Sequence, residues 1–369
     1  MENILIMKTK IIIDARSLTD NPVGIARYVT EITALLYSFG WDIVLVSNKK
    51  IILPNKLADL DIDFKLLPFS KFLPGTISIM FFISFLSFKE NYVFWGANHV
   101  VPIWKCRGVK SILTLHDIVA IKYRKTMTLR NWFMNVFSLR LSMFFCDELT
   151  VVSEFTKNEI ITDIWGGQKV KPIIVIKNSV DREFFSFVSD VPATCKENFI
   201  LSVGTLEPRK NLPMLIEAFS SLVVNEKYNG MLVIVGNQGW KSKGLVKLIK
   251  FYGLESKVVL PGYVDDEELV KLYSHCDLFV FPSLYEGFGI PPLEASCCNA
   301  KVVSTIYSEI PYLDLNNVIL YDPGSDDLYL MISKTMKLDV SNTTNYNETW
   351  EDSAKILDKL VQKISLGFL

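Results

Sequence analysis

The sequence lacks several features that would assign it to a familiar class of protein. Its six cysteines include no Cys-x-x-Cys pair, so neither a zinc site nor a dithiol redox site is indicated, and we expect reduced thiols in a cytoplasmic protein. No run of the sequence reaches the about 20 apolar residues that a membrane-spanning helix needs. Lys8 and Lys10 interrupt the N-terminus, where a signal peptide would need an uncharged apolar stretch.

Glycine and charge are also missing where other functions would need them. The first predicted strand is not followed by Gly-x-Gly-x-x-Gly, which weighs against a nicotinamide oxidoreductase. The formal net charge of −1 argues against a surface built throughout to bind nucleic acid. The only Asp-x-Asp strings lie within Asp59–Asp63, which we interpret as a surface turn.

Positive charge is nevertheless concentrated in one region. Residues 91–146 contain eight basic side chains and a single acid. Residues 121–145 combine this charge with aromatic side chains, a composition that suits the surface of an anionic bilayer. We therefore expect peripheral attachment to the inner face of the plasma membrane through Lys122, Arg124 and Lys125. An ordinary domain helix with basic side chains is the alternative.

The chain is long enough for two domains. A single hydrophobic core stops growing at about 250–300 residues, and this chain has 369 residues, of which 50% are hydrophobic. Short β-branched runs alternate with amphipathic stretches, the pattern of parallel sheets covered by helices. Two series of strands are predicted, at residues 10–14, 43–47, 92–95, 111–115, 148–152 and 173–176, and at residues 199–203, 232–235, 258–260, 278–281 and 301–304. Each series suffices for one doubly wound α/β domain.

A linker separates the two series. Residues 186–198 lose the periodicity and collect Ser, Asp, Pro, Ala, Thr and Lys, so we place the boundary near residue 190. One apolar stretch, residues 72–88, fits either a buried helix or a helix lying in a membrane interface. The predicted units are residues 1–189, residues 190–349, and a final helix at residues 350–369 that packs back toward the first domain.

The most informative segment is residues 281–296. A buried strand leads into a glycine-bearing turn and then into a helix, which Pro291 and Pro292 would begin because proline suits the first helical turn. Glu286 lies in the predicted loop and Glu294 on the first turns of the helix. Both carboxylates can therefore face one ligand from different heights.

The residues between these glutamates favour close approach of a ligand. Gly287 and Gly289 flank Phe288 and let a ligand come near the backbone, and free N–H groups at the helix start suit an anion such as a diphosphate. We expect all three residues to contact that ligand. The alternative is a plain strand-turn-helix junction whose glutamates are solvated or cap the helix.

The Glu286-x7-Glu294 string resembles the signature of retaining GT-B glycosyltransferases of the family 4 type, particularly bacterial mannosyltransferases of O-antigen and surface-polysaccharide assembly. The resemblance implies two Rossmann-like, doubly wound parallel-sheet domains that face one another across a cleft. It implies an acceptor at the N-terminal domain and a nucleotide sugar at the C-terminal domain. It also implies that Glu294 binds the ribose and that Glu286 lies beside the donor sugar.

A basic loop matches the same family. Residues 203–212 read Val-Gly-Thr-Leu-Glu-Pro-Arg-Lys-Asn-Leu and resemble the strand-to-helix loop that grips the donor diphosphate. Arg209 and Lys210 are the candidates, because a dianionic leaving group needs fixed positive charge. Many relatives carry arginine directly after the glycine, where this chain has Thr205, so we expect Arg209 to take a larger share. A basic pair on a solvated loop is the alternative.

Three further positions match family landmarks. Gly24 resembles the first glycine loop, which opens a helix near the donor phosphates and the acceptor, although a plain helix N-terminus explains it nearly as well. His116 ends a predicted strand, and the resemblance places it beside the donor sugar, to hold a hydroxyl or shield developing positive charge; a structural histidine is the alternative. Asp117 is expected to orient loops, and Gly236 to contact the nucleotide.

These matches predict a retaining hexosyltransferase of bacterial lipopolysaccharide or O-antigen biosynthesis. The expected donor is a nucleotide sugar, with GDP-mannose as the first choice, and the expected acceptor is a lipid-linked saccharide or an oligosaccharide. No metal cofactor is expected, since Arg209 and Lys210 would neutralise the leaving diphosphate. No nucleic-acid partner is expected either. The alternatives are a nucleotide-sugar epimerase of the same architecture, and a transferase that uses a UDP-sugar or another GDP-sugar.

Overall fold

The computed structural model describes residues 9–18, 24–67, 74–82, 91–105, 108–124, 127–237, 243–339 and 346–366. The chain forms two compact units. The first contains Met1–Ser179 together with Glu348–Leu369, and the second contains Val180–Asn347. The chain thus leaves the first unit shortly before the linker-like residues 186–198 and returns to it for the final helix.

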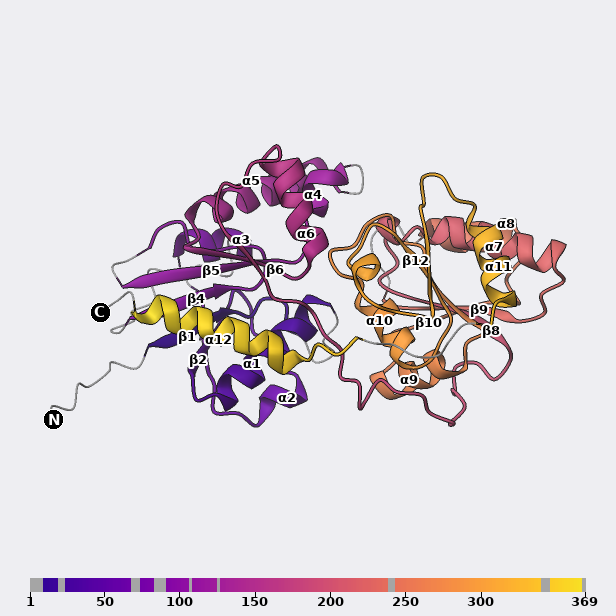
Figure 1. Cartoon of the computed structure of the whole chain (residues 1–369), viewed down its shortest axis with the longest axis horizontal. Coiled ribbons are helices and arrows are strands. Elements are labelled where there is room, and N and C mark those ends of the chain that lie inside the picture. Colours follow the sequence, from indigo (N-terminus) through magenta and orange to yellow (C-terminus); the bar gives the residue numbers. More distant parts are fainter. Residues whose placement is uncertain are drawn as a thin grey trace. The chain divides into compact units, whose positions relative to one another are not determined.

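The first unit is built on a seven-stranded parallel sheet with the order β3-β2-β1-β4-β5-β6-β7 (Figure 1). Ile11, Ile12 and Ile13 are completely buried although successive side chains point to opposite faces, so the sheet is covered on both faces. The strands are β1 (Lys10–Asp14), β2 (Asp42–Ser47), β3 (Asp63–Leu66), β4 (Tyr92–Gly96), β5 (Val109–Leu115), β6 (Glu148–Val151) and β7 (Ile173–Val175).

Helices and helical turns connect and cover these strands. They include α1 (Ile25–Ser38), α2 (Asn55–Ala58), α3 (Gly75–Ile77), α4 (Val119–Lys122), α5 (Leu129–Phe145), α6 (Glu154–Glu159) and α12 (Trp350–Leu366), with π-helical turns at Ser78–Phe82 and Ile160–Ile164. Of the apolar stretch at residues 72–88, the described part buries Ile79 and Met80 in the core. Among the described residues, no helix has both the length and the apolar character that crossing a bilayer requires.

The last helix belongs to the first unit. α12, yellow in Figure 1, runs beside α1. Trp41 donates its indole N–H to the Asp358 carboxylate at 2.7 Å, and the Trp350 and Tyr28 ring centroids lie 6.0 Å apart. Leu357 is fully buried on the inner face of the helix. The C-terminal segment therefore completes the core that the N-terminal strands begin.

The second unit repeats the architecture with a six-stranded parallel sheet in the order β10-β9-β8-β11-β12-β13. Its strands are β8 (Phe199–Val203), β9 (Met231–Val235), β10 (Val258–Gly262), β11 (Leu278–Phe281), β12 (Val302–Thr305) and β13 (Val318–Tyr321). Its helices include α7 (Leu212–Asn225), α8 (Lys243–Phe251), α9 (Asp266–His275), α10 (Ile290–Cys297) and α11 (Leu328–Lys337), with 3₁₀ turns at Pro208–Lys210 and Ile310–Tyr312. The predicted α/β class with two parallel-sheet domains is confirmed.

Two edge strands were not predicted. β3 begins at Asp63, inside the segment interpreted as a surface turn, and its Phe64 and Leu66 side chains are exposed. An edge strand with one bonded neighbour does not need the continuous apolar run by which buried strands are recognised. β13 does carry such a run, which the prediction omitted.

Adjacent residues of α12 provide a test of its place in the core. Leu357→Ala removes a fully buried side chain and should cost about 2–5 kcal/mol. Ile356→Ala, at a position that is 40% exposed, should change stability by no more than about 0.5 kcal/mol. Urea unfolding followed by tryptophan fluorescence measures both, because six of the seven tryptophans lie in the first unit. Equal effects of the two substitutions would contradict the packing of α12.

Candidate functional site

Polar side chains gather at one point of each sheet, the place where the strand order reverses. In the second unit this point lies between β8 and β11, and in the first it lies between β1 and β4. Ligands of doubly wound sheets bind outside the carboxyl ends of the strands at such a switch point. The loops that follow these four strands are therefore the first places to look for a site.

In the second unit, the loops after β8 and β11 are tied together. The backbone N–H of Leu284 donates to the Arg209 carbonyl at 2.8 Å, and the Arg209 guanidinium donates back to the Tyr285 carbonyl at 2.8 Å. The N–H of Glu286 donates to the Tyr307 carbonyl at 2.8 Å. These bonds bring together the basic loop and the glutamate loop, which the sequence had suggested separately.

Glu286 lies between two cations. Its Oε2 is 2.5 Å from Nη1 of Arg209, and its Oε1 is 2.7 Å from Nζ of Lys210. The Glu207 carboxylate accepts hydrogen bonds from Nε of Arg209 at 3.0 Å and from Nη2 at 2.7 Å, and these two bonds fix the plane of the guanidinium. The Lys210 ammonium also lies 4.8 Å from the centre of the Phe281 ring. Two basic and two acidic side chains thus form one ion cluster.

The cluster keeps Glu286 ionised. Burial alone would raise the pKa of this carboxyl group, but Arg209 and Lys210 outweigh it and lower the pKa to about 2. Glu286 is therefore an anion throughout the neutral pH range. The alternative, a basic pair on a solvated loop, does not fit the structure, because both cations contact a carboxylate that is only 9% exposed.

The second glutamate lies on α10. Glu294 is buried, and its Oε2 accepts the hydroxyl of Tyr273 at 3.0 Å. Gly289, with φ of 99°, immediately precedes the helix, and a side chain there would meet Ile310 at 3.1 Å. The backbone conformation and the close neighbour both favour glycine at this turn.

Gly287 and Phe288 lie in the same loop, between Glu286 and the start of α10. Phe288 is buried, and its carbonyl accepts the N–H of Glu309 at 3.0 Å. Phe288 therefore anchors the loop through its buried ring and its backbone carbonyl. The whole sequence string from Glu286 to Glu294 occupies one corner of the second unit.

Gly236 follows β9, the strand next to β8. A Cβ atom at this position would lie 2.2 Å from the carbonyl oxygen of Gly204, so only glycine lets the loops after β8 and β9 approach so closely. Residues 238–242, which follow this loop, lie outside the described residues. Gly236 has a packing function that the sequence did not indicate.

In the first unit, His116 follows β5 and is 7% exposed. Its Nε2 lies 2.9 Å from the carbonyl oxygen of Ala97, so Nε2 carries the proton and Nδ1 is an acceptor. Burial lowers the pKa of His116 to about 3. The Tyr28 ring meets the imidazole edge to face at 5.1 Å. His116 is a neutral, rigidly held imidazole.

Gly24 precedes α1 with φ of 53°, a backbone conformation that residues other than glycine rarely adopt. A Cβ atom added there would meet nothing within 4 Å. Backbone geometry rather than crowding therefore favours glycine at this position.

A polar network at the switch point of the first sheet was not predicted from the sequence. Asp14 is completely buried at the end of β1, and its two oxygens accept Nε and Nη2 of Arg16 at 2.8 and 2.7 Å. Arg16 also donates to the Thr76 hydroxyl at 3.1 Å, and Asn98 donates to the Asp14 carbonyl at 2.7 Å. The available signal was the acid that ends the first buried strand.

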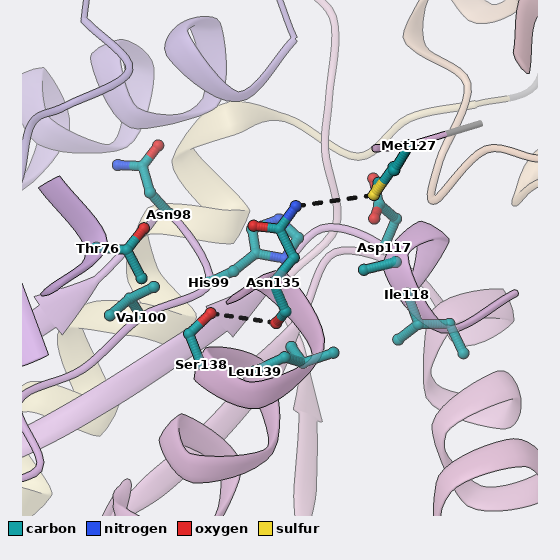
Figure 2. Close-up of a pocket in the computed structure, with 11 residues that line it drawn as sticks. Thr76, Asn98, His99, Val100, Asp117, Ile118, Met127, Asn135, Ser138 and Leu139 are labelled. Atoms are coloured by element: carbon teal, nitrogen blue, oxygen red, sulfur yellow. Dashed lines mark hydrogen bonds between the residues drawn. The ribbon is translucent and has the colours of Figure 1, made fainter. Parts of the chain in front are cut away.

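A cavity of about 240 Å³ opens beside this network (Figure 2). It lies among the segments after β4 and β5, the turn around Thr76 and the inner side of α5. Its wall combines hydroxyl, amide, imidazole and carboxylate groups with apolar side chains. The lining residues are Thr76, Asn98, His99, Val100, Asp117, Ile118, Ala120, Met127, Asn135, Ser138 and Leu139.

Comparison with known proteins agrees with this arrangement. Residues 186–351 match the family model described as glycosyl transferases group 1. The chain is 29% identical over 251 residues to O-antigen chain mannosyltransferase B of Escherichia coli, which covers 64% of this chain and 63% of that protein. It is 32% identical over 244 residues to O-antigen chain mannosyltransferase RfbU of Salmonella typhimurium, covering 66% and 64%. The chain therefore spans less than two thirds of the length of these relatives.

Solved structures share the fold over nearly the whole chain. Sucrose-phosphate synthase from Thermosynechococcus elongatus matches with a TM-score of 0.71 at 17% identity, covering 98% of this chain and 97% of that one. WaaG, a glycosyltransferase involved in lipopolysaccharide biosynthesis, matches with a TM-score of 0.68 at 15% identity, covering 96% and 98%. Residues 186–351 thus match the glycosyl transferases group 1 model, and the chain has the GT-B fold of glycosyltransferases and resembles the bacterial O-antigen mannosyltransferases in sequence.

Proposed function

We propose that this protein is a retaining hexosyltransferase that transfers mannose from GDP-mannose to a lipid-linked saccharide or an oligosaccharide in bacterial surface-polysaccharide assembly. The second unit takes the nucleotide sugar and the first takes the acceptor. The observation that carries the proposal is the contact of Arg209 and Lys210 with Glu286 at the switch point of the second sheet. The O-antigen mannosyltransferases among the relatives support mannose as the sugar.

The cation pair is suited to a diphosphate. Arg209 and Lys210 offer charged N–H donors that now serve the Glu286 carboxylate, and phosphate oxygens accept the same kind of bond. Binding of a nucleoside diphosphate exchanges one anion for another at these donors. Glu286 is then released from the cations and can accept hydroxyls of the donor sugar. Glu207 keeps the guanidinium in place during the exchange.

The remaining residues of the second unit hold the nucleotide. Glu294, oriented by the Tyr273 hydroxyl, binds the ribose hydroxyls. The N–H groups that begin α10, with the backbone of Gly287, Phe288 and Gly289, face the diphosphate, because a helix N-terminus favours an anion. Gly236 borders the nucleotide.

The transfer step needs little covalent chemistry from the protein. The bond from the anomeric carbon to the diphosphate breaks with its electron pair leaving on the phosphate oxygen, which Arg209 and Lys210 stabilise. The acceptor oxygen forms the new bond on the same face, and its proton passes to the departing phosphate, which retains the configuration. His116 and Gly24 of the first unit contact the substrate. Nδ1 of the neutral His116 accepts a hydrogen bond from a sugar hydroxyl.

α5 is the surface that we assign to the membrane. Phe133, Phe137 and Phe144 are 60%, 48% and 78% exposed, and their spacing places them along one side of the helix. The helix contains no acidic residue, while Arg130 and Arg140 are exposed. Exposed aromatic side chains with flanking arginines suit the inner face of an anionic membrane, where a lipid-linked acceptor is found.

One of the charges first assigned to the membrane needs correction. Lys122 forms ion pairs with Glu159 and Asp163, so its charge is already neutralised within the unit. Arg124 lies over the Trp132 ring at 4.6 Å, and Lys125 lies outside the described residues. The side chains of α5 therefore replace Lys122 as the expected contacts.

Replacing Glu286 by glutamine separates the two tasks of this residue. Glu286→Gln removes the charge that competes for Arg209 and Lys210, so GDP should bind at least as tightly as to the wild type, measured by calorimetry. Turnover of GDP-mannose with acceptor should fall by at least about 100-fold, the scale for losing a polar group that acts on the reacting centre. Wild-type turnover in this variant would remove Glu286 from the site.

Nucleotide selectivity tests the donor. GDP should raise the melting temperature more than UDP, ADP or dTDP, because a ligand at about 100 times its Kd stabilises the folded state by about 2.7 kcal/mol. The shift should disappear in Arg209→Ala, whereas an exposed control, Lys247→Ala on α8, should keep it. A shift with UDP alone would replace the guanosine donor, and turnover of donor without acceptor would indicate the epimerase.

Flotation with phosphatidylglycerol vesicles tests the membrane surface. The double substitution Phe133→Ser and Phe144→Ser should weaken vesicle binding by at least about 100-fold, since burying each phenyl group contributes about 1.5–3 kcal/mol. Phe251→Ser is the matched control, because Phe251 is 79% exposed on a helix of the other unit. Failure of the wild type to float at low salt would refute the assignment.

A further inference from the structure

The cavity in the first unit has the position of a binding site. It opens at the carboxyl ends of β4 and β5, beside the switch point between β1 and β4. Its volume of about 240 Å³ is just below the about 300–1,000 Å³ of sites for drug-sized ligands. The space therefore suits one small ring rather than a chain of several sugars.

A strained turn forms one wall of the cavity. His99 has φ of 64°, which is uncommon for a residue other than glycine. The turn is tight, because a side chain at Gly96 would lie 2.2 Å from the Val100 carbonyl oxygen, and Asn98 anchors it to Asp14 at 2.7 Å. Strain of this kind persists where surrounding contacts enforce it, and it is concentrated at functional sites.

Polar groups of three different segments converge on the cavity (Figure 2). His99 comes from the turn after β4, Asp117 from the segment after β5, and Asn135 from α5. Asp117 uses Oδ1 to accept the N–H of Val119 at 3.0 Å, which fixes the carboxylate and leaves further acceptor capacity. The Asn135 amide donates to the Met127 sulfur at 3.8 Å, a weak bond that a better acceptor can replace.

The charge of the wall excludes an anionic ligand. Among the described lining residues Asp117 is the one with a full charge, and no lysine or arginine is among them. Arg16, which contacts Thr76 of the wall, is neutralised by both oxygens of Asp14. Burial lowers the pKa of His99, so its imidazole is neutral. Among the described residues of the wall, a phosphate or carboxylate would therefore find no cation, while hydroxyl groups would find both donors and acceptors.

We propose that this cavity binds one uncharged sugar ring of the acceptor, with His99, Asp117 and Asn135 holding its hydroxyl groups. Val100 and Leu139 supply apolar surface for the C–H face of the ring. The inference rests on the proposed function, since it names the chemistry by which the first unit recognises its acceptor. The diphosphate or lipid of that acceptor lies outside the cavity.

The test uses the full chain and two probes, methyl α-D-mannopyranoside and mannose 6-phosphate, in saturation-transfer NMR titrations. The neutral mannoside should bind, and the phosphorylated sugar should bind at least about tenfold more weakly, because it must bring an unpaired anion into the cavity. Equal or tighter binding of mannose 6-phosphate would overturn the proposal. So would the absence of any mannoside signal while GDP still raises the melting temperature.

Variants locate the signal. Asn135→Leu keeps the size of the side chain and should weaken mannoside binding about tenfold, the effect of losing about one hydrogen bond, as should Asp117→Asn. Asn131→Leu is the matched control, because Asn131 is exposed one turn earlier on α5 and does not line the cavity. An unchanged mannoside affinity in both cavity variants would refute the site. Retained GDP binding in all three would show that the proposed function is unaffected, whereas loss of GDP binding in the wild type would count against that function instead.

Discussion

The ion pairs of Glu286 with Arg209 and Lys210 determine the architecture of the second unit's site. A carboxylate that is nearly buried requires positive partners, because an unpaired buried charge is strongly destabilising. The two cations meet this requirement only if the loops after β8 and β11 lie together. The backbone bond from Leu284 to Arg209 and the bond from the Arg209 guanidinium to the Tyr285 carbonyl hold them there. The same donors are those that a diphosphate would use, so the interaction that stabilises the loops also prepares the site.

The two units share one sheet topology, but the charges at their switch points differ. In the second unit, the switch point presents cations beside a helix N-terminus, an environment for phosphate. In the first unit, Asp14 neutralises the charge of Arg16. The described lining of the neighbouring cavity contains neutral polar groups and a single carboxylate. This division agrees with a nucleotide sugar on one unit and a sugar acceptor on the other.

Much of the fold and part of the site could be predicted from sequence. The buried run Ile11–Ile13 and its counterparts identify parallel strands without further information, and the string from Glu286 to Glu294 places both glutamates at one strand end. The pair Asn98 and Asp14, 84 residues apart in sequence, could not be predicted, because it depends on β1 lying next to β4. The ion pairs of Lys122 could not be predicted either, because its partners Glu159 and Asp163 come from another segment. For that reason Lys122 was assigned to the membrane. The local sequence pattern identifies strands and helices. The partner that neutralises a charged side chain depends on which segments the fold brings together.

In the proposed mechanism, Arg209 and Lys210 exchange the Glu286 carboxylate for a diphosphate. A crystal structure of the protein grown with GDP tests it most directly. The account predicts phosphate oxygens within hydrogen-bond distance of both cations and a Glu286 side chain that has turned away from at least one of them. A diphosphate bound elsewhere, with both ion pairs of Glu286 intact, would contradict it.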